Sequence, residues 1–255
     1  MNRLQNKVTL VTGASDGIGF EISRAFAEES AVVVMVDRDS GKLHTKAKLL
    51  QDRGLRVRPV PCDVGSSANV QHAVQVALDG FGRLDVLVNN AAVAIPGDIT
   101  DQCEEDWNQL LNINLLGVLR GIKYALPSML ARKSGSIINM ASVQGDRSWN
   151  HWTTYAAAKG AMKAITRQLA GQYGPHGVRF NCISPGAMET PTHEARRARE
   201  GEAFHEECCR MHALGRMGAA SEVNGAAVFL ASDEAAFVTG IDLLVDGGMS
   251  VLTRN

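Results

Sequence analysis

The sequence has little excess charge of either sign and no long apolar run. Of its 255 residues, 26 are lysine or arginine and 27 are aspartate or glutamate, so the formal net charge is −1. Proteins that bind nucleic acid usually carry a clear basic excess, and this balance therefore argues against a nucleic acid partner. No apolar run approaches the roughly 18–20 residues that cross a bilayer, so we expect no membrane partner.

The cysteines do not form a disulfide framework. There are five of them, an odd number without Cys-x-x-Cys spacing, and only Cys208 and Cys209 are neighbours. This usage fits reduced thiols better than a disulfide-stapled secreted protein. The first apolar strand is expected near residue 7, which leaves no room for a secretory signal, and we expect a cytoplasmic location.

What the sequence does contain is a regular alternation of apolar strands and helical stretches. An apolar content of 45% over 255 residues is enough for one large α/β domain, which we expect to span residues 1–255. The expected strands lie at about 7–11, 31–36, 56–60, 85–88, 135–140, 177–183 and 241–245. Successive βαβ units of this kind predict a Rossmann-like, doubly wound parallel sheet of about seven strands with helices on both faces.

A glycine-rich turn follows the first expected strand. It contains Gly13, Gly17 and Gly19 and leads into an amphipathic stretch at 20–29. Glycines let the backbone approach a ligand closely, and the start of a helix offers free N–H groups and a partial positive charge to a pyrophosphate. The turn therefore predicts a dinucleotide site, although its G-x-x-x-G-x-G spacing differs from the usual G-x-G-x-x-G.

An acidic residue ends the second expected strand. Asp37 lies eighteen residues after Gly19, where a carboxylate can accept hydrogen bonds from the adenosine ribose and repel a 2′-phosphate. Asp16 adds negative charge in the turn itself, whereas Arg38 could pair with such a phosphate. The balance favours NAD over NADP.

The strongest chemical signal is the pair Tyr155 and Lys159. They are four residues apart, so one helix would place both heads on one face, and Ser142 lies upstream. A cation near a phenol lowers its pKa from about 10 toward working pH, and such a phenol can transfer protons.

Taken together, the motifs resemble the short-chain dehydrogenase/reductase family over nearly the full length of the chain. The resemblance rests on the turn Thr12–Gly19, on Asp63 with Val64, on the run Asn89-Asn90-Ala91, on Asn114, on Ser142, Tyr155 and Lys159, on Pro185, Gly186 and Thr190, and on the run 245–248. One departure is Ala92, which stands where the family usually has glycine.

The resemblance implies roles for these residues. Tyr155 would exchange a proton with the substrate oxygen, Ser142 would hydrogen-bond that oxygen, and Lys159 would hold the nicotinamide ribose and lower the pKa of Tyr155. Asn114 would position a water that links Lys159 to solvent. The implied cofactor residues are Gly13, Ser15, Asp16, Gly17, Ile18, Gly19, Asp37, Arg38, Asp63, Val64, Asn90, Tyr155, Lys159, Pro185, Gly186 and Thr190.

Substrate choice is expected between Ser142 and Tyr155 and after Pro185. Gln144, Trp149 and Trp152 are largely uncharged and, with Met188, predict an apolar pocket for a cyclic or aromatic small molecule. The tryptophans could instead cover a subunit contact. Phe204 could add apolar contact from the other side.

Residues 188–213 are expected to form a polar lid over the substrate. Arg196, Arg197 and Arg199 could attract an anionic substrate, but interleaved glutamates suggest a solvated face. His205, Cys209 and His212 have i, i+4, i+7 spacing, yet a lid helix explains them without a metal, and we expect none.

The leading hypothesis is an NAD-dependent oxidoreductase acting on a secondary alcohol or ketone. The alternatives are a 3-oxoacyl-carrier-protein reductase and, from another class, a dinucleotide-sensing subunit without turnover. The resemblance and the apolar ending at 241–251 further suggest a homotetramer, with the long helices after Cys103 and Trp152 pairing between subunits.

Overall fold

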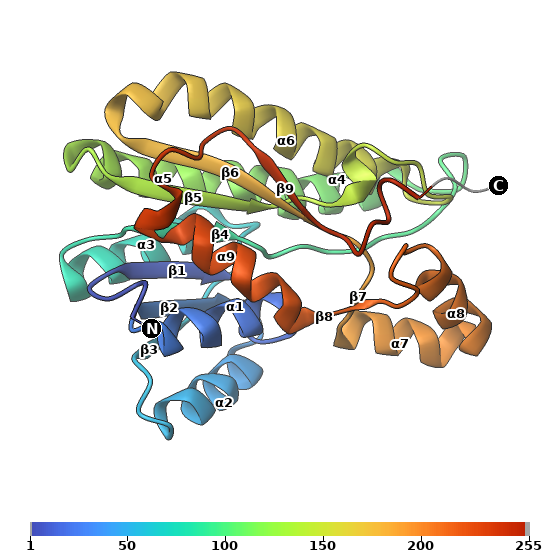
Figure 1. Cartoon of the computed structure of the whole chain (residues 1–255), viewed down its shortest axis with the longest axis horizontal. Helices are drawn as coiled ribbons and strands as arrows, with labels where there is room; N and C mark the ends of the chain where they lie inside the picture. The colour runs from blue at the N-terminus through green and yellow to red at the C-terminus, as the bar shows by residue number, and fades with distance from the viewer. Residues whose placement is uncertain (1, 253–255) are drawn as a thin grey trace.

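The computed structural model describes residues 2–252 and is built on one sheet of seven parallel strands (Figure 1). The strand order is β3-β2-β1-β4-β5-β6-β9. The strands are β1 (Val8–Thr12), β2 (Val32–Asp37), β3 (Val57–Pro61), β4 (Val86–Asn89), β5 (Gly135–Met140), β6 (Val178–Pro185) and β9 (Asp242–Val245). The predicted fold class is confirmed, and each strand lies within two residues of its expected bounds.

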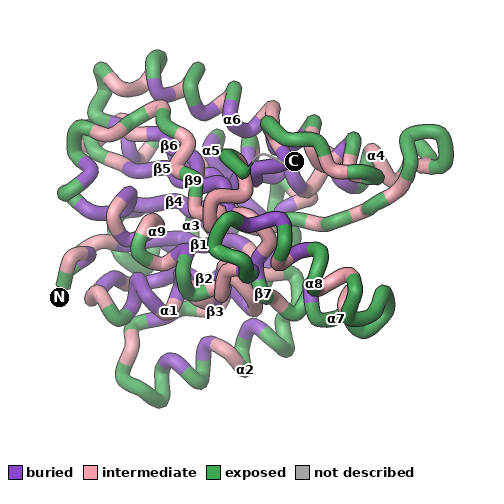
Figure 2. The backbone as a smooth tube through the Cα atoms, turned by 45° about the vertical axis from the view of Figure 1, so that its right-hand side comes forward, coloured by how far each residue is buried: buried purple, intermediate pink, exposed green. Residues whose placement is uncertain are grey.

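Helices cover both faces of the sheet. One face carries α1, α2 and α9, and the other carries α3, α5 and α6, as the two separate apolar cores show. The helices are α1 (Gly17–Glu28), α2 (Ser40–Gln51), α3 (Ser67–Phe81), α4 (Glu104–Leu111), α5 (Gly117–Ala131), α6 (Thr153–Tyr173), α7 (Pro191–Glu200), α8 (Glu202–Arg210) and α9 (Asn224–Ala231). Figure 2 shows the buried residues gathered along the strands between these layers.

The strands are apolar throughout because both of their faces are buried. In β2, Val33 and Met35 pack into the core with α1 and α2, whereas Val34 and Val36 pack into the core with α3 and α5. Successive side chains of a strand point to opposite faces, so two cores require a continuous apolar run.

The strand order places the site. The chain runs outward from β1 to β3 and then returns to start β4 on the other side of β1. Ligands in open parallel sheets bind beyond the carboxyl ends of the strands at such a reversal. The residues that follow β1, β2, β4 and β5 are therefore brought to one edge.

The segment from β7 to α8 lies beside this edge, outside the two helical layers (Figure 1). A short pair of parallel strands, β7 (Met188–Glu189) and β8 (Gly218–Ala219), ties its beginning to the chain that follows it. The sequence did not predict this pair, because two-residue strands carry no periodicity. Within residues 2–252, no helix has the length and apolar character needed to cross a membrane.

Candidate active site

A cleft of about 780 Å³ opens over the carboxyl ends of the strands. It brings together predicted site residues from six segments of the chain. They are Gly13, Asp16, Gly17, Ile18, Asp37, Arg38, Asn90, Ser142, Tyr155, Lys159, Pro185, Gly186, Met188 and Thr190.

The glycine turn has the geometry needed for a ligand to lie against its backbone. Gly13 and Gly17 have φ angles of +67° and +47°, a region that other residues rarely adopt. A Cβ atom at Gly19 would lie 2.0 Å from the carbonyl oxygen of Gly13, so only glycine fits there. The turn leads directly into α1, whose N-terminus faces the cleft. These features suit the pyrophosphate of a dinucleotide.

Asp37 is held in place by two backbone groups. Its carboxylate accepts hydrogen bonds from the N–H of Ser15, at 3.2 Å, and from the N–H of Asp39, at 3.1 Å. Ser15 itself is buried and does not line the cleft, so its contribution is to orient Asp37.

Asp16 carries less weight for cofactor choice than the sequence suggested. One carboxylate oxygen accepts from the N–H of Gly17 at 2.8 Å and caps α1, and the other pairs with Lys42. Because Lys42 offsets this charge, discrimination against a 2′-phosphate would rest mainly on Asp37. Arg38 lies in the same cleft.

Asp63 and Val64 line a small neighbouring cavity of about 100 Å³ rather than the main cleft. This cavity shares Gly13, Asp37 and Arg38 with the cleft. The adenine side of a dinucleotide could extend from one into the other.

Tyr155 and Lys159 lie on α6, as their spacing predicted, and both line the cleft beside Ser142. The Ser142 side chain acts on the Tyr155 phenol as a hydrogen-bonding group that lowers its pKa. Burial raises the pKa of Tyr155 to about 12, and the bond to Ser142 only partly opposes this. Tyr155 is therefore a neutral phenol, which is the form that donates a proton.

The effect of Lys159 on the pKa of Tyr155 stays a prediction. The Lys159 ammonium donates to the carbonyl oxygen of Met140 at 2.6 Å and lies 5.4 Å from the centre of the Tyr155 ring. Burial lowers the pKa of Lys159 to about 8. The loss of hydration is the main cause of this change, since it disfavours the charged form of the lysine.

Asn114 lies in a π-helical turn, η1 (Asn112–Leu116), that joins α4 to α5. Its buried amide accepts from the N–H of Val93 at 2.8 Å and donates to the carbonyl oxygen of Val93 at 2.9 Å. Asn114 thus fixes the loop at 91–95, which lines the cleft. Its role in holding a water stays a prediction.

Ala92 also lies in this loop and lines the cleft. Its φ angle is not positive. The backbone at this position does not need glycine, so the departure from the family pattern leaves the loop unstrained.

An inner pocket of about 210 Å³ adjoins the catalytic groups. Gln144, Trp149, Trp152 and Met188 line it together with Ser142 and Tyr155. The Trp152 ring meets the Tyr155 ring edge to face, with centroids 5.3 Å apart. The structure thus brings the predicted substrate residues together, and within this chain both tryptophans face the pocket.

The segment after β6 completes the cleft. Pro185 and Gly186 end the strand, and Thr190 caps α7 by accepting from the N–H of His193 at 3.3 Å. His212 ties this segment to α8, because its Nε2 accepts from the N–H of Ala187 at 3.0 Å while its Nδ1 contacts the carbonyl oxygen of Cys208 at 2.8 Å.

This placement of His212 separates it from the other two residues of the metal-like spacing. His205 contacts Cys209, at 3.6 Å, and His193, at 3.2 Å. Among residues 2–252, no group of three or more histidine, cysteine or acidic side chains is arranged to hold a metal.

Several lining residues were not predicted from the sequence. They are Ala91, Ala94, Ile95, Asp106, Gln109, Met140, Ala141, Ala187, Thr192, His193 and Cys208. The loop at 91–95 follows β4, so its position after a strand could have indicated it. His193 and Arg196 are one helical turn apart on α7, but nothing in the sequence indicates which face of that helix meets the pocket.

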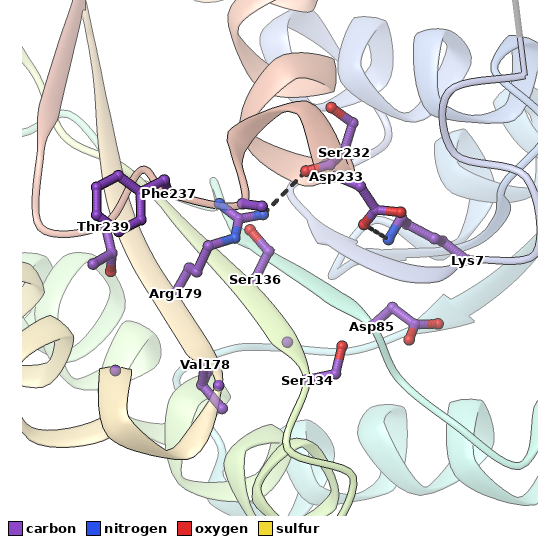
Figure 3. Close-up of a pocket in the computed structure, with 15 residues that line it drawn as sticks. Lys7, Asp85, Ser134, Ser136, Val178, Arg179, Ser232, Asp233, Phe237 and Thr239 are labelled. Carbon is purple, nitrogen blue, oxygen red and sulfur yellow. Dashed lines mark hydrogen bonds and ion pairs between the residues drawn. The ribbon is translucent and has the colours of Figure 1, made fainter.

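A second cavity, of about 500 Å³, lies at the opposite, amino end of the strands (Figure 3). Its charged groups bond to the protein itself. Arg179 donates to the carbonyl oxygens of Leu230, at 2.7 Å, and Ser232, at 3.3 Å, and Lys7 pairs with Asp233 at 2.7 Å. These groups hold the end of α9 against the sheet.

The fold and the cleft define the class: an oxidoreductase of the kind that binds a nicotinamide cofactor. A family model described as enoyl-(acyl carrier protein) reductase matches residues 13–250. The chain belongs to the short-chain dehydrogenase/reductase family, as its motifs indicated.

Known proteins resemble the chain along almost its whole length. Oxidoreductase UcpA of Salmonella typhimurium is 40% identical over 256 residues, covering 98% of this chain and 97% of its own. L-fucose dehydrogenase of Mus musculus is 41% identical, with coverage of 97% and 90%. A solved structure of a gluconate 5-dehydrogenase from Burkholderia cenocepacia, in complex with NADP and tartrate, has 34% identity and a TM-score of 0.92, with coverage of 99% and 98%.

Proposed function

We propose that the protein is an NAD-dependent oxidoreductase that transfers hydride between nicotinamide and a secondary alcohol or ketone. The observation that carries this proposal is one cleft lined both by Asp37 and by Ser142, Tyr155 and Lys159. Gly13, Gly17, Asp37 and Lys159 would hold the cofactor, which supplies or accepts the hydride. The substrate oxygen would lie against Ser142 and Tyr155.

The proton chemistry follows from these groups. In ketone reduction, carbon gains the hydride while the Tyr155 hydroxyl gives its proton to the carbonyl oxygen, and Ser142 hydrogen-bonds the oxygen as negative charge develops. Alcohol oxidation reverses both transfers. A pKa of about 12 keeps Tyr155 protonated at neutral pH, ready for the reductive direction. The Asn114 relay and closure of 188–213 over substrate are parts of this proposal.

The inner pocket supports an uncharged substrate with a cyclic or aromatic body. Trp149, Trp152 and Met188 line it, and the guanidinium of Arg196, which also lines it, is paired with Glu200. The likeness to a protein named L-fucose dehydrogenase adds an uncharged sugar to the compounds to test. The likeness to a gluconate 5-dehydrogenase keeps sugar acids among the compounds to test.

We also propose a cytoplasmic homotetramer. Leu116 and Leu119 lie exposed where η1 meets α5, and Leu244 and Val251 lie exposed near the end of the chain, with exposed fractions between 39% and 74%. Such apolar side chains suit contacts between subunits. Light scattering at micromolar concentration tests the assembly, and a stable monomer would contradict it.

A panel of substrates tests the proposed function. Cyclohexanol, 1-phenylethanol, L-fucose and gluconate are assayed for oxidation with NAD and with NADP, and acetoacetyl-CoA is assayed for reduction with both reduced cofactors. We expect the uncharged ring compounds with NAD to give the highest kcat/KM. Preference for the acetoacetyl thioester with NADPH would favour the carrier-protein reductase alternative, and cofactor binding without turnover of any substrate would favour the sensing subunit.

A further inference from the structure

The inner pocket is separated by a thin wall from a larger groove. The groove has a volume of about 810 Å³ and lies between α7, α8, the loop at 147–151 and the segment around Met249. The inner pocket contains Ser142 and Tyr155, whereas the groove contains neither. The residues that line both cavities, and therefore form the wall, are Trp149, Arg196, Phe204 and Cys208.

Arg196 is the member of this wall held by contacts with three other side chains. Its guanidinium lies over the ring of Phe204, at 4.2 Å, and over the ring of Trp152, at 5.5 Å. Its Nε donates to the Glu200 carboxylate at 2.6 Å. Trp152 lines the inner pocket and Glu200 lines the groove, so Arg196 reaches from one cavity to the other.

These contacts hold the Arg196 side chain between the two cavities, so it is not a surface charge surrounded by water. A cation over an aromatic face is attracted by the ring, most strongly where water is partly excluded, and only about a quarter of the Arg196 side chain is exposed. Its neighbour Arg197 behaves differently, because it pairs with Glu202 and lines neither cavity.

The volumes indicate what this closure does. Pockets that hold drug-sized ligands usually measure about 300–1,000 Å³, and the inner pocket falls below this range at about 210 Å³. Removing the wall would join the pocket to a groove of about 810 Å³ that also offers apolar surface, from Phe204, Met211 and Met249.

We propose that Arg196 is a specificity-determining residue that closes the far end of the inner pocket and limits the substrate to a compact body. This inference rests on the proposed function, because it takes the inner pocket as the substrate site. Opening the closure would admit a substrate with a second ring.

Two readouts test the proposal. In the first, kcat/KM is measured for cyclohexanone and for 4-phenylcyclohexanone with NADH, in the wild type, in Arg196→Ala and in the matched control Arg197→Ala. In the second, Kd is measured by calorimetry for phenol and for 4-phenylphenol, which cannot be oxidised as secondary alcohols and so report binding alone. Thermal unfolding of each variant shows that it is folded.

We expect Arg196→Ala to raise kcat/KM of the two-ring ketone relative to the one-ring ketone by about tenfold or more, and to lower the Kd of 4-phenylphenol relative to that of phenol by a similar factor. Arg197→Ala should leave both ratios near the wild-type value. Glu200→Gln, which removes one contact of Arg196, should give an intermediate shift.

The outcomes separate the two proposals. An unchanged ratio of the two Kd values in a folded Arg196→Ala variant would overturn the role of Arg196. Failure of that variant to bind either phenol would overturn it as well. An equal shift in Arg197→Ala would also overturn it, because a general change in lid charge would then explain the result. A tenfold shift in the ratio of the two Kd values without turnover of any ketone would support the role of Arg196 and contradict the proposed reaction.

Discussion

The two ends of the seven-stranded sheet each carry a cavity, and the two cavities use their polar groups differently. At the amino end, Arg179 and Lys7 are matched by carbonyl and carboxylate groups of the protein itself. At the carboxyl end, Lys159 has the Met140 carbonyl as its one hydrogen-bond partner among residues 2–252, whereas Arg179 has several, although burial lowers the pKa of both side chains. The amino end therefore contributes to stability, whereas the carboxyl end keeps groups in costly states that a bound cofactor and substrate can use.

The largest effect should come from the proton donor at the carboxyl end. Tyr155→Phe removes only the hydroxyl, so we expect kcat to fall by about 10²–10⁴-fold while cofactor Kd and the melting temperature stay near wild type. The matched control is Tyr124→Phe, because the Tyr124 hydroxyl also contacts a serine, Ser67, at 2.7 Å but lies outside the cleft. Substantial turnover by the Tyr155 variant at saturating cofactor would show that another group carries the proton.

The opposite pattern is expected at the amino end. Arg179→Ala removes donors from the carbonyl groups of Leu230 and Ser232, and we expect a loss of about 2–4 kcal/mol in the free energy of unfolding. For a chain of this size that corresponds to roughly 5–10 °C in melting temperature, with kcat/KM of the folded protein preserved. Lys48→Ala, which removes an exposed pair with Asp52, is the control and should cost less than about 1 kcal/mol. A fall in kcat without a loss of stability would remove the distinction between the two ends.

At the carboxyl end, we expect loss of a buried lysine to stabilise the protein. The pKa of Lys159 falls from 10.5 to about 8 on folding, so the folded state disfavours its charge at pH 7. Lys159→Met should raise the free energy of unfolding at pH 7 by on the order of 1–2 kcal/mol while reducing activity and cofactor affinity. Urea unfolding at several pH values measures this.

The lowered pKa of Lys159 determines how the free energy of unfolding should change with pH. Between about pH 8 and 10.5 the unfolded wild type binds more protons than the folded one, so its stability rises with pH and the advantage of the Met variant should shrink. Lys163→Met is the contrast. Burial alone lowers the pKa of Lys163, but hydrogen bonds with Asp146 and Asp242 outweigh burial and raise it. Loss of this lysine should destabilise the protein, and the same sign for both variants would refute the assignment.

The smallest effect concerns cofactor choice. Asp37→Asn removes one charge near the expected 2′-phosphate position, so the ratio of NADP(H) to NAD(H) Kd should fall by about tenfold. Lys42→Ala should shift that ratio in the opposite direction, because it leaves the Asp16 carboxylate without its cation. Fluorescence titration of both cofactors measures the ratios. If Asp37→Asn leaves its ratio unchanged, or if the wild type already binds NADP(H) more tightly, Asp37 does not select NAD.

The fold was predictable because apolar runs and turns mark each strand locally. Tyr155, Lys159 and Ser142 were predictable as a group because each carries distinctive chemistry after a strand or on one helical face. The direction of the pKa change at Tyr155 was not, since it depends on how much protein surrounds the hydroxyl. The pairing of Asp16 with Lys42 and the position of Arg196 between two rings arise from contacts across loops, which no local pattern indicates.

The π-helical turn η1 makes the chain sensitive to deletion of a single codon. It holds one residue more than an α-helical turn, and Arg120 bonds the carbonyl oxygen of Asn112, at 3.1 Å, and the Asn112 side chain, at 2.7 Å. Each residue of an α-helix turns the chain by about 100°, so we expect loss of codon 112 or 113 to rotate Asn114 away from Val93. Codon substitutions keep this register, whereas a one-codon deletion releases the loop at 91–95 that lines the cleft.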